Sequence, residues 1–189
     1  MMTGPFRSFH SLRLRVRAVA LPAALVLGAA TGLPASLPAS ADTKLSPGDT
    51  QFVQDASQAG ATEIAASKLA LANAADPRVK QFAQQMIADH TKLARGLDVI
   101  ATQKGLGKPP GADSALVGKL QGLKGGDFDK LYVDEVAVAG HQKAVELFQK
   151  ESETGQDPQL KGAATRALPI IRHHLAMAQQ LANARKASS

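Results

Sequence analysis

The sequence contains no cysteine and no tryptophan, and it has one tyrosine among its 189 residues. Without cysteine there are no disulfides, no thiolate metal ligands and no thiol nucleophile. The scarcity of aromatic rings and the dispersed basic residues argue against nucleic-acid binding, because bases stack on aromatic side chains beside clustered positive charge. No alternation of polar and apolar residues indicates a strand. We therefore expect an all-α protein without a nucleic-acid partner.

The N-terminal residues have the pattern of a secretory signal peptide. Four arginines precede the apolar run "AVALPAALVLGAA" at 18–30, and no acidic residue lies before or within it. A small-residue cleavage site follows at 39–41. The run is short for a membrane span and Pro22 interrupts it, which favours a cleaved leader of residues 1–41 over a retained N-terminal anchor. This predicts an exported protein, periplasmic or secreted, with no stable membrane insertion after cleavage.

The remaining residues, 42–189, are enough for one domain with a hydrophobic core. The whole chain has 22 Lys and Arg against 16 Asp and Glu, and four of the arginines belong to the predicted leader. Most of the basic excess therefore leaves with the leader. The charge balance of the domain indicates no particular partner, and the sequence specifies neither a protein partner nor an oligomeric state.

Short cap motifs mark the helix starts in this domain. Ser46 precedes Pro47 with Asp49 in the first turn, and the pairs Asp76–Pro77 and Asp157–Pro158 repeat the same chemistry. A side-chain oxygen at the N-cap accepts from free backbone amides, and proline suits the first helical position because it has no amide to leave unpaired. We expect helices over about 47–75, 77–104, 127–153 and 158–185.

Residues 105–126 connect the second and third expected helices. The segment is rich in glycine, and "DSALVGKLQGL" within it is a candidate short helix. Antiparallel neighbours need far fewer connecting residues, whereas about 22 residues can run the length of a bundle of helices about 40 Å long. This predicts two helical hairpins joined by a long crossover, which is a ferritin-like four-helix bundle. A simple up-and-down bundle with a flexible loop is the alternative.

Each expected helix has one apolar face whose members follow steps of three and four residues. Five polar side chains interrupt these faces: Glu63, His90, Asp134, His141 and His174. A histidine on such a face is most often a hydrogen-bonded core or boundary residue. Several titratable groups on four facing helices require more explanation, because burying them without partners costs several kcal/mol.

The heights of these residues along the bundle are matched. Glu63 lies 13 residues before the cap of the second helix and His90 lies 14 after it, so an antiparallel hairpin sets them side by side. His141 lies 16 residues before the cap of the fourth helix and His174 lies 17 after it. If the hairpins pack face to face, these four side chains meet in one transverse layer near mid-bundle.

Two interpretations of this layer are open. The first is a metal site with Glu63, His90, His141 and His174 as ligands, a donor set that suits one Zn, Cu or Fe ion better than Ca or Mg. The second is a metal-free network of hydrogen bonds. Met86 and Met177 lie within one turn of layer histidines, which adds a copper(I) option, although methionine at such positions is more often core filling.

Several residues near the layer are relevant to both interpretations. Asp89 is placed to orient His90 or an adjacent imidazole, with an ordinary solvated carboxylate as the alternative, and Asp134 is a second supporting acid. His173 is expected to face solvent. Gly60 and Gly140 flank the layer and leave space for a ligand or for close helix approach. Pro169, within the fourth helix, is expected to kink it or to free a carbonyl near the layer.

Four segments of the sequence together resemble a bacterial family of exported proteins. They are "FVQDASQAGATEIAASKLA", "VKQFAQQMIADHTKLARGL", "FDKLYVDEVAVAGHQKAVELFQ" and "LPIIRHHLAMAQQLA". The most specific parts are Met86 to His90, His141 with Gln142, and Leu168 and Pro169 ahead of His174. The family is catalogued as domain of unknown function 4142, and its members are often labelled outer-membrane proteins. The resemblance covers about residues 48–184. It implies a ferritin-like bundle and no established activity.

Ferritin chemistry does not carry over to this sequence. Di-iron bundles use a Glu-x-x-His pair on each of two helices, whereas Ile87 and Ile171 stand three residues before His90 and His174. Hydrolase, phosphate-loop and haem-attachment motifs are also missing, so an enzyme is the least favoured class. The leading hypothesis is an exported metal-binding bundle. The alternative is a structural or interaction protein of the cell envelope with a metal-free polar core.

Overall fold

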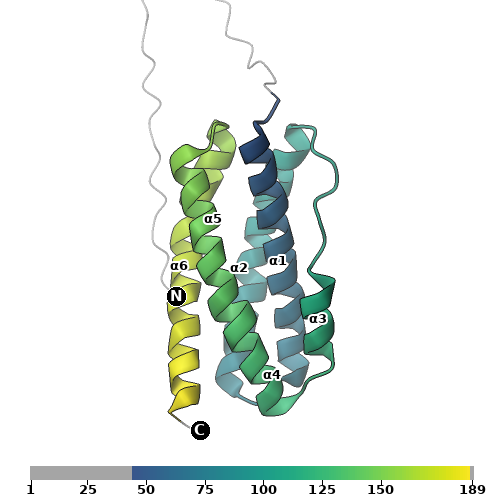
Figure 1. Cartoon of the computed structure of the whole chain (residues 1–189), viewed down its shortest axis with the longest axis vertical. Helices are drawn as coiled ribbons and strands as arrows, with labels where there is room; N and C mark the ends of the chain where they lie inside the picture. Colours follow the sequence, from purple (N-terminus) through teal and green to yellow (C-terminus); the bar gives the residue numbers. More distant parts are fainter. Residues whose placement is uncertain (1–43, 188–189) are drawn as a thin grey trace, which may run out of the picture. The chain divides into compact units, whose positions relative to one another are not determined.

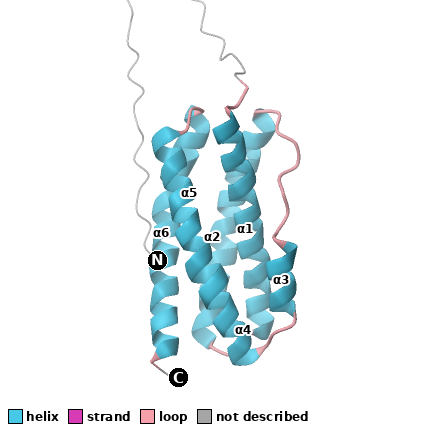
Figure 2. Cartoon of the chain, in the orientation of Figure 1, coloured by secondary structure: helices cyan, strands magenta, loops and turns pink. Residues whose placement is uncertain are grey.

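The computed structural model describes residues 44–187, and these residues form helices and connecting loops (Figure 2). The described part contains no named strand; one isolated bridge joins Ala74 and Gly125. The all-α prediction is therefore confirmed. The predicted signal peptide, residues 1–41, lies outside the described residues and stays a prediction. None of the described helices combines the length and the hydrophobicity that a membrane span requires.

Four long helical segments and one short helix make up the described chain. Helices α1 and α2 form the first hairpin, α3 lies in the crossover, and α4, the π-helical segment η1 and α5 follow one another without a loop before α6. The bounds are α1 Pro47–Asn73, α2 Pro77–Gln103, α3 Ser114–Gln121, α4 Gly125–Leu131, η1 Tyr132–Gly140, α5 His141–Thr154 and α6 Pro158–Lys186. The predicted third helix is thus a composite, and the candidate short helix is α3.

The predicted caps are present. Ser46 Oγ accepts from the Asp49 amide at 3.0 Å, and Asp76 and Asp157 accept from amides in the first turns of α2 and α6. A proline occupies the start of each of these helices. Pro169 does not end α6, which continues through it to Lys186. Local cap chemistry therefore fixes where three of the four long segments begin.

The connectivity is that of two hairpins joined by a long crossover. In Figure 1, α1 and α2 run antiparallel, and the chain then travels back along the bundle through α3 before α4 begins at the opposite end. Consecutive contacts link α1 with α2, α2 with α6, α6 with α5, and α5 with α1. The crossover topology is therefore the observed one, and the simple up-and-down alternative is excluded.

Two aspartates tie the hairpins together in the same way at opposite ends of the bundle. Near the start of α1, Asp49 accepts from the amides of Gln156 and Asp157 in the α5–α6 turn, at 2.9 and 3.2 Å. In α4, Asp129 accepts from the amides of Ala75 and Asp76 in the α1–α2 turn, at 3.2 and 2.9 Å. Each aspartate thus binds the turn of the other hairpin.

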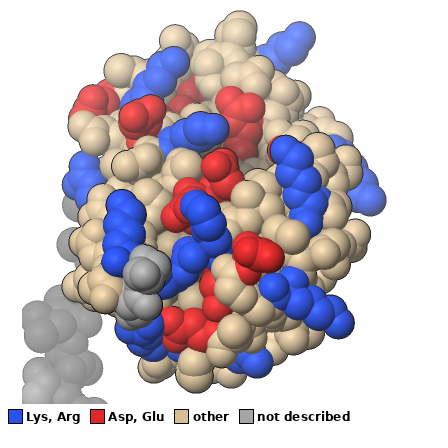
Figure 3. All heavy atoms as spheres, turned by 60° about the horizontal axis from the view of Figure 1, so that its bottom comes forward, with Lys and Arg blue, Asp and Glu red and all other residues tan. Residues whose placement is uncertain are grey.

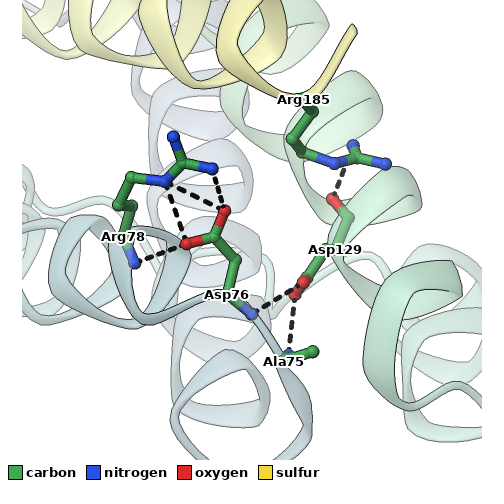
Figure 4. A network of polar contacts seen from close by, with 5 residues as sticks. All are labelled: Ala75, Asp76, Arg78, Asp129 and Arg185. Atoms are coloured by element: carbon green, nitrogen blue, oxygen red, sulfur yellow. Dashed lines mark hydrogen bonds and ion pairs between the residues drawn. The ribbon is translucent and has the colours of Figure 1, made fainter. Parts of the chain in front are cut away.

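Figure 4 shows this clamp at the α1–α2 end. Arg185 of α6 donates to the backbone carbonyl of Asp129 at 3.2 Å, while Arg78 holds the cap residue Asp76. At the other end Lys104 pairs with Asp157 at 2.6 Å. Because buried carboxylates satisfy otherwise free turn amides, both clamps fix how far one hairpin slides along the other. That register decides which mid-helix side chains meet.

The two larger of three hydrophobic clusters fill the bundle on either side of its middle. The cluster toward the α1–α2 turn contains Phe82, Met86, Phe128 and Tyr132. The cluster toward the α5–α6 turn contains Phe52, Leu97 and other apolar residues of α1, α2 and α6. The predicted polar layer lies between these clusters, where its members are shielded from water at both ends.

The π-helical segment η1 immediately precedes His141. Hydrogen bonds in a π-helix join residue i to residue i+5 instead of i+4. The side chains of such a segment therefore point in different directions from those that a straight α-helix would give them. As a result Val133, Val136 and Ala137 are buried, and Asp134 points away from the core. Its carboxylate pairs with Lys130 at 2.8 Å with its side chain 41% exposed. The predicted face for this helix was therefore wrong around Asp134.

The outer surface carries charges of both signs. In the view of Figure 3, basic and acidic side chains are interspersed over the α1–α2 end of the bundle. Local pairs such as Lys130 with Asp134 and Arg78 with Asp76 account for part of this mixing. Exposed pairs of this kind contribute little to stability, and this mixed surface indicates no particular partner.

Candidate metal centre

Glu63, His90, His141 and His174 meet in the middle of the bundle, as their spacing predicts. They come from α1, α2, the start of α5 and α6, and none is more than 4% exposed. The three imidazole ring centres lie 5.2 to 5.6 Å from one another. One carboxylate and three imidazoles thus form a single buried cluster.

A chain of close polar contacts runs through the cluster. Glu63 Oε2 lies 2.8 Å from His90 Nδ1. On the other side of the same ring, His90 Nε2 lies 3.2 Å from His174 Nδ1. His174 Nε2 then lies 3.1 Å from Asp89 Oδ2, whose side chain is 22% exposed. Two imidazoles therefore stand in a row with a carboxylate at each end.

His141 completes the cluster from the side. Its Nδ1 lies 3.5 Å from both Glu63 Oε1 and the Val136 carbonyl, while its Nε2 is buried without any hydrogen-bond partner among the described residues. Phe82 covers both His141 and His174 with edge-to-face contacts, at ring-centre distances of 6.5 and 6.4 Å. A buried ring nitrogen without a partner is costly, and a ligand bound to this nitrogen would remove that cost.

Burial and neighbouring charges shift the ionisation of these groups. Burial lowers the pKa of His174 to about 4, assisted by the nearby His90. Burial also lowers the pKa of His141. Burial by itself would raise the pKa of Glu63, but His90 and the other imidazoles outweigh it and leave that pKa below the ordinary value. The cluster therefore favours a charged Glu63 beside neutral His141 and His174.

The carboxylates determine which ring nitrogens remain available. Charged Glu63 accepts a hydrogen bond from His90 Nδ1–H, and Asp89 accepts one from His174 Nε2–H, so that these protons stay on the outer nitrogens of the rings. The two inner nitrogens, His90 Nε2 and His174 Nδ1, then face each other at 3.2 Å with either one proton between them or two lone pairs. Two lone pairs at that distance repel unless a cation lies between them.

The inner nitrogens have the spacing of two ligands on one metal ion. Imidazole nitrogens bind Zn at 2.0–2.1 Å, which places tetrahedral neighbours about 3.3 Å apart. One nitrogen from each of His90, His141 and His174 lies within 4.8 Å of the others. This limit is wider than about 3.3 Å, so His141 has to move closer to bind the same ion, and its Nε2 has no hydrogen bond to give up. The three histidines could therefore hold one ion.

Of the two expected supporting residues, Asp89 contacts the cluster and Asp134 does not. Asp89 contacts the cluster, through His174 rather than His90, and it also accepts from Gln85 at 2.9 Å. Asp134 does not reach the cluster, because η1 turns it outward toward Lys130. Glu63 lies against two imidazoles but stands outside the three-histidine group. The geometry therefore makes Glu63 a hydrogen-bond partner of ligand rings rather than a fourth ligand.

The structure also locates the other residues that were predicted to lie near the layer. Met86 is fully buried in the hydrophobic cluster toward the α1–α2 turn, and Met177 packs against that cluster, which fits the core-filling interpretation. His173 is exposed, as expected. Gly140 lies beside the histidines: a Cβ at this position would be 3.8 Å from Glu63 Oε1. This is ordinary van der Waals contact, so the approach to Glu63 does not require a glycine here.

Sequence reasoning missed the residues that surround the layer. Phe82 was not singled out from the sequence, although it is 2% exposed and shields two histidines. Tyr132 is fully buried and its hydroxyl lies 2.8 Å from Ser67 Oγ; burial raises the pKa of this phenol. The available signal was that Phe82 and Tyr132 stand next in sequence to Ala83 and Leu131 of the expected apolar faces, and a wide apolar face includes such neighbours.

Two cavities border the cluster at Glu63. One, of about 230 Å³, extends along the bundle interior and is also lined by His90. The other, of about 610 Å³, is a more polar groove between α1, α3 and the η1–α5 segment. Glu63 Oε1 has no hydrogen-bond partner among the described residues. The buried layer is thus adjacent to space on two sides.

Comparison with known proteins supports the fold and names no activity. The family model described as Domain of unknown function (DUF4142) matches residues 34–181. No curated protein matches the chain at a significant level. Among solved structures, the chain is similar to a DUF305 fragment from Deinococcus radiodurans, with a TM-score of 0.62 and 18% sequence identity over 74% of this chain and 98% of the fragment. At that identity the likeness concerns the fold alone.

Proposed function

This chain belongs to the family of domain of unknown function DUF4142, and we propose that it binds one transition-metal ion through His90, His141 and His174. The observation that carries the proposal is the convergence of three buried imidazoles, one of which has a ring nitrogen without a partner. A carboxylate behind a ligating histidine fixes its tautomer and orientation. Glu63 and Asp89 supply this support for His90 and His174.

The donor set restricts the class of metal. Neutral imidazoles suit Zn, Cu and Fe, whereas Ca and Mg prefer several oxygen ligands. Three protein ligands leave a further coordination position for water or a small molecule. We propose binding in an exported protein, without assigning a reaction.

The alternative is a metal-free polar core in an envelope protein. In that case one proton lies between His90 Nε2 and His174 Nδ1, and the carboxylates at the ends of the row hold the pair in place. This arrangement satisfies both rings but leaves His141 Nε2 without a partner. The metal proposal accounts for all three rings, and for that reason it is preferred.

Metal analysis of the untagged, full-length gene product purified from the exported fraction tests the proposal. We expect near-stoichiometric Zn, Cu or Fe by mass spectrometry in the parent protein. A His90→Ala/His141→Ala variant should lose the metal and keep its helical circular dichroism. The matched control is His173→Ala, which removes an exposed histidine from α6 and should leave the metal content unchanged.

Two results would contradict metal binding. The first is a metal-free parent whose melting temperature does not respond to added Zn, Cu or Fe, although a ligand that binds the native state raises that temperature. The second is equal metal content in the parent and the double variant. Either result leaves the metal-free polar core as the explanation of the layer.

A further inference from the structure

The cavity of about 230 Å³ that borders the histidine cluster is lined mainly by apolar residues of four helices. Phe52 and Phe148 lie on its walls and contact each other edge to face at 5.1 Å. The remaining apolar lining comes from Leu, Ile, Ala and Gly residues of α1, α2, α5 and α6. Cavities of this kind between the helices of a bundle are common sites for small molecules.

Small residues create this space. Alanines at 56, 59, 144, 163 and 167 line the cavity where larger core residues would fill it. Gly60 also lines it, and a Cβ built on this helical glycine meets no atom within 4 Å. Glycine within a helix lowers stability relative to alanine. The sequence thus keeps empty a volume that ordinary packing would fill.

Charges distinguish the two ends of the cavity. At the inner end stands Glu63, whose carboxylate is buried against His90. The exposed lining residues Lys92 and Arg166 mark the mouth, between α2 and α6, and Lys92 already pairs with Asp89 at 3.9 Å. Arg166 has no hydrogen bond or ion pair with any side chain in the described part of the chain. An anionic group is therefore favoured at the mouth and disfavoured at the inner end.

We propose that this cavity binds a small carboxylate with an apolar chain or ring, its body inside the cavity and its acid group at Arg166. An apolar cavity of about 150 Å³ holds benzene, so one of 230 Å³ has room for about nine carbon atoms. The apolar walls recognise the body, and the guanidinium recognises the head. This inference does not depend on metal at the histidine cluster.

Octanoate is a suitable probe, and isothermal titration calorimetry on the metal-free, full-length protein is the test. We expect octanoate to bind with one-to-one stoichiometry and more tightly than octan-1-ol or octylammonium. Arg166→Gln should weaken octanoate about fivefold, as an exposed ion pair of about 1 kcal/mol would, and should leave octan-1-ol unchanged. High salt should weaken octanoate alone.

Filling the cavity separates it from other apolar surfaces. Gly60→Leu should reduce the affinity for octanoate at least tenfold. The matched control is Gly118→Leu in α3, because this exposed helical glycine also has open space around its Cβ position but does not line the cavity. Helical circular dichroism of both variants verifies that they fold.

Three outcomes would overturn the inference. They are no octanoate binding to the parent at millimolar concentration, equal binding by Gly60→Leu and the parent, and octylammonium binding as tightly as octanoate. None of these bears on the histidine cluster, because the titration is done without metal. A repeat with His141→Ala, which removes a cluster histidine that does not line this cavity, is expected to show octanoate binding within about twofold of the parent. Loss of binding in that variant would be a fourth contradicting outcome.

Discussion

His90 and His174 face each other nitrogen to nitrogen across 3.2 Å, and each ring is held from behind by a carboxylate. The two carboxylates, Glu63 and Asp89, fix the outer protons and so direct the inner lone pairs toward one point. His141 adds a third nitrogen from the end of a π-helical segment. This arrangement explains why imidazoles occupy apolar helix faces where leucine would pack at lower cost.

Glu63 holds His90 in place, so replacing Glu63 should weaken metal binding although all three histidine ligands remain. Glu63→Gln keeps the side-chain shape and removes the charge that holds the proton on His90 Nδ1. We expect metal affinity to fall about 10- to 100-fold, measured by competition with a chromogenic chelator. Asp134→Asn is the matched control, since Asp134 pairs with Lys130 away from the cluster, and an equal loss in both variants would contradict this role.

Replacing His90 in the metal-free protein should reveal how much free energy it costs to bury the charge of Glu63. In His90→Leu the carboxylate stays buried without its closest partner, and we expect a loss of about 3–5 kcal/mol in the free energy of unfolding. Glu63→Gln/His90→Leu should recover part of this loss, because no charge is then left unpaired. Urea denaturation in EDTA measures both values. A double variant less stable than His90→Leu would refute the explanation.

Glu151 should make the stability of the protein depend on pH. Burial raises its pKa from 4.5 to about 7, and the Asp49 and Asp157 carboxylates add to the shift. The native state therefore keeps a proton that the unfolded chain has lost, so the contribution is full below pH 4.5 and is lost as pH rises through about 7. The lowered pKa of His174 acts oppositely, since its contribution is lost as pH falls below 6.5 toward about 4.

The variant Glu151→Gln isolates the first of these effects. From about pH 5 to about pH 8 the free energy of unfolding of the variant should rise relative to that of the parent. The His174 contribution is the same in both proteins and cancels in this difference. Chemical denaturation at several pH values in the absence of metal provides the measurement. A difference that stays constant over this range would show that Glu151 titrates normally.

Gly155 is required by close packing rather than by its backbone angles. Its φ of −55° is open to any residue, but a Cβ here would lie 2.5 Å from Glu151 Oε1 and 2.6 Å from the Glu151 carbonyl oxygen. We expect Gly155→Ala to lower stability by about 1–3 kcal/mol, measured by thermal unfolding. Gly111→Ala serves as the control, because a methyl group on that loop glycine would have no atom within 4 Å. Equal effects of the two substitutions would rule out the packing explanation.

Much of the architecture follows from local sequence chemistry. Ser46–Pro47, Asp76–Pro77 and Asp157–Pro158 fix the helix starts because caps and prolines act through the nearest backbone groups. Residues 105–126 are long enough to run the length of the bundle, which predicted a crossover, but their length alone left a simple up-and-down bundle with a flexible loop as the alternative. Counting residues from the caps also placed Glu63 beside His90 and His141 beside His174, because an α-helix rises by a constant amount per residue.

Only the tertiary structure decided the outward direction of Asp134 and the ring nitrogens that remain available at the cluster. The π-helical segment rotates one face of its helix, and its energy depends on packing that no single helix encodes. The tautomers follow from carboxylates on other helices, and the cavity follows from small residues that meet across four helices. Such features depend on distances between side chains remote in sequence, whereas caps and periodicity depend on neighbours along the chain.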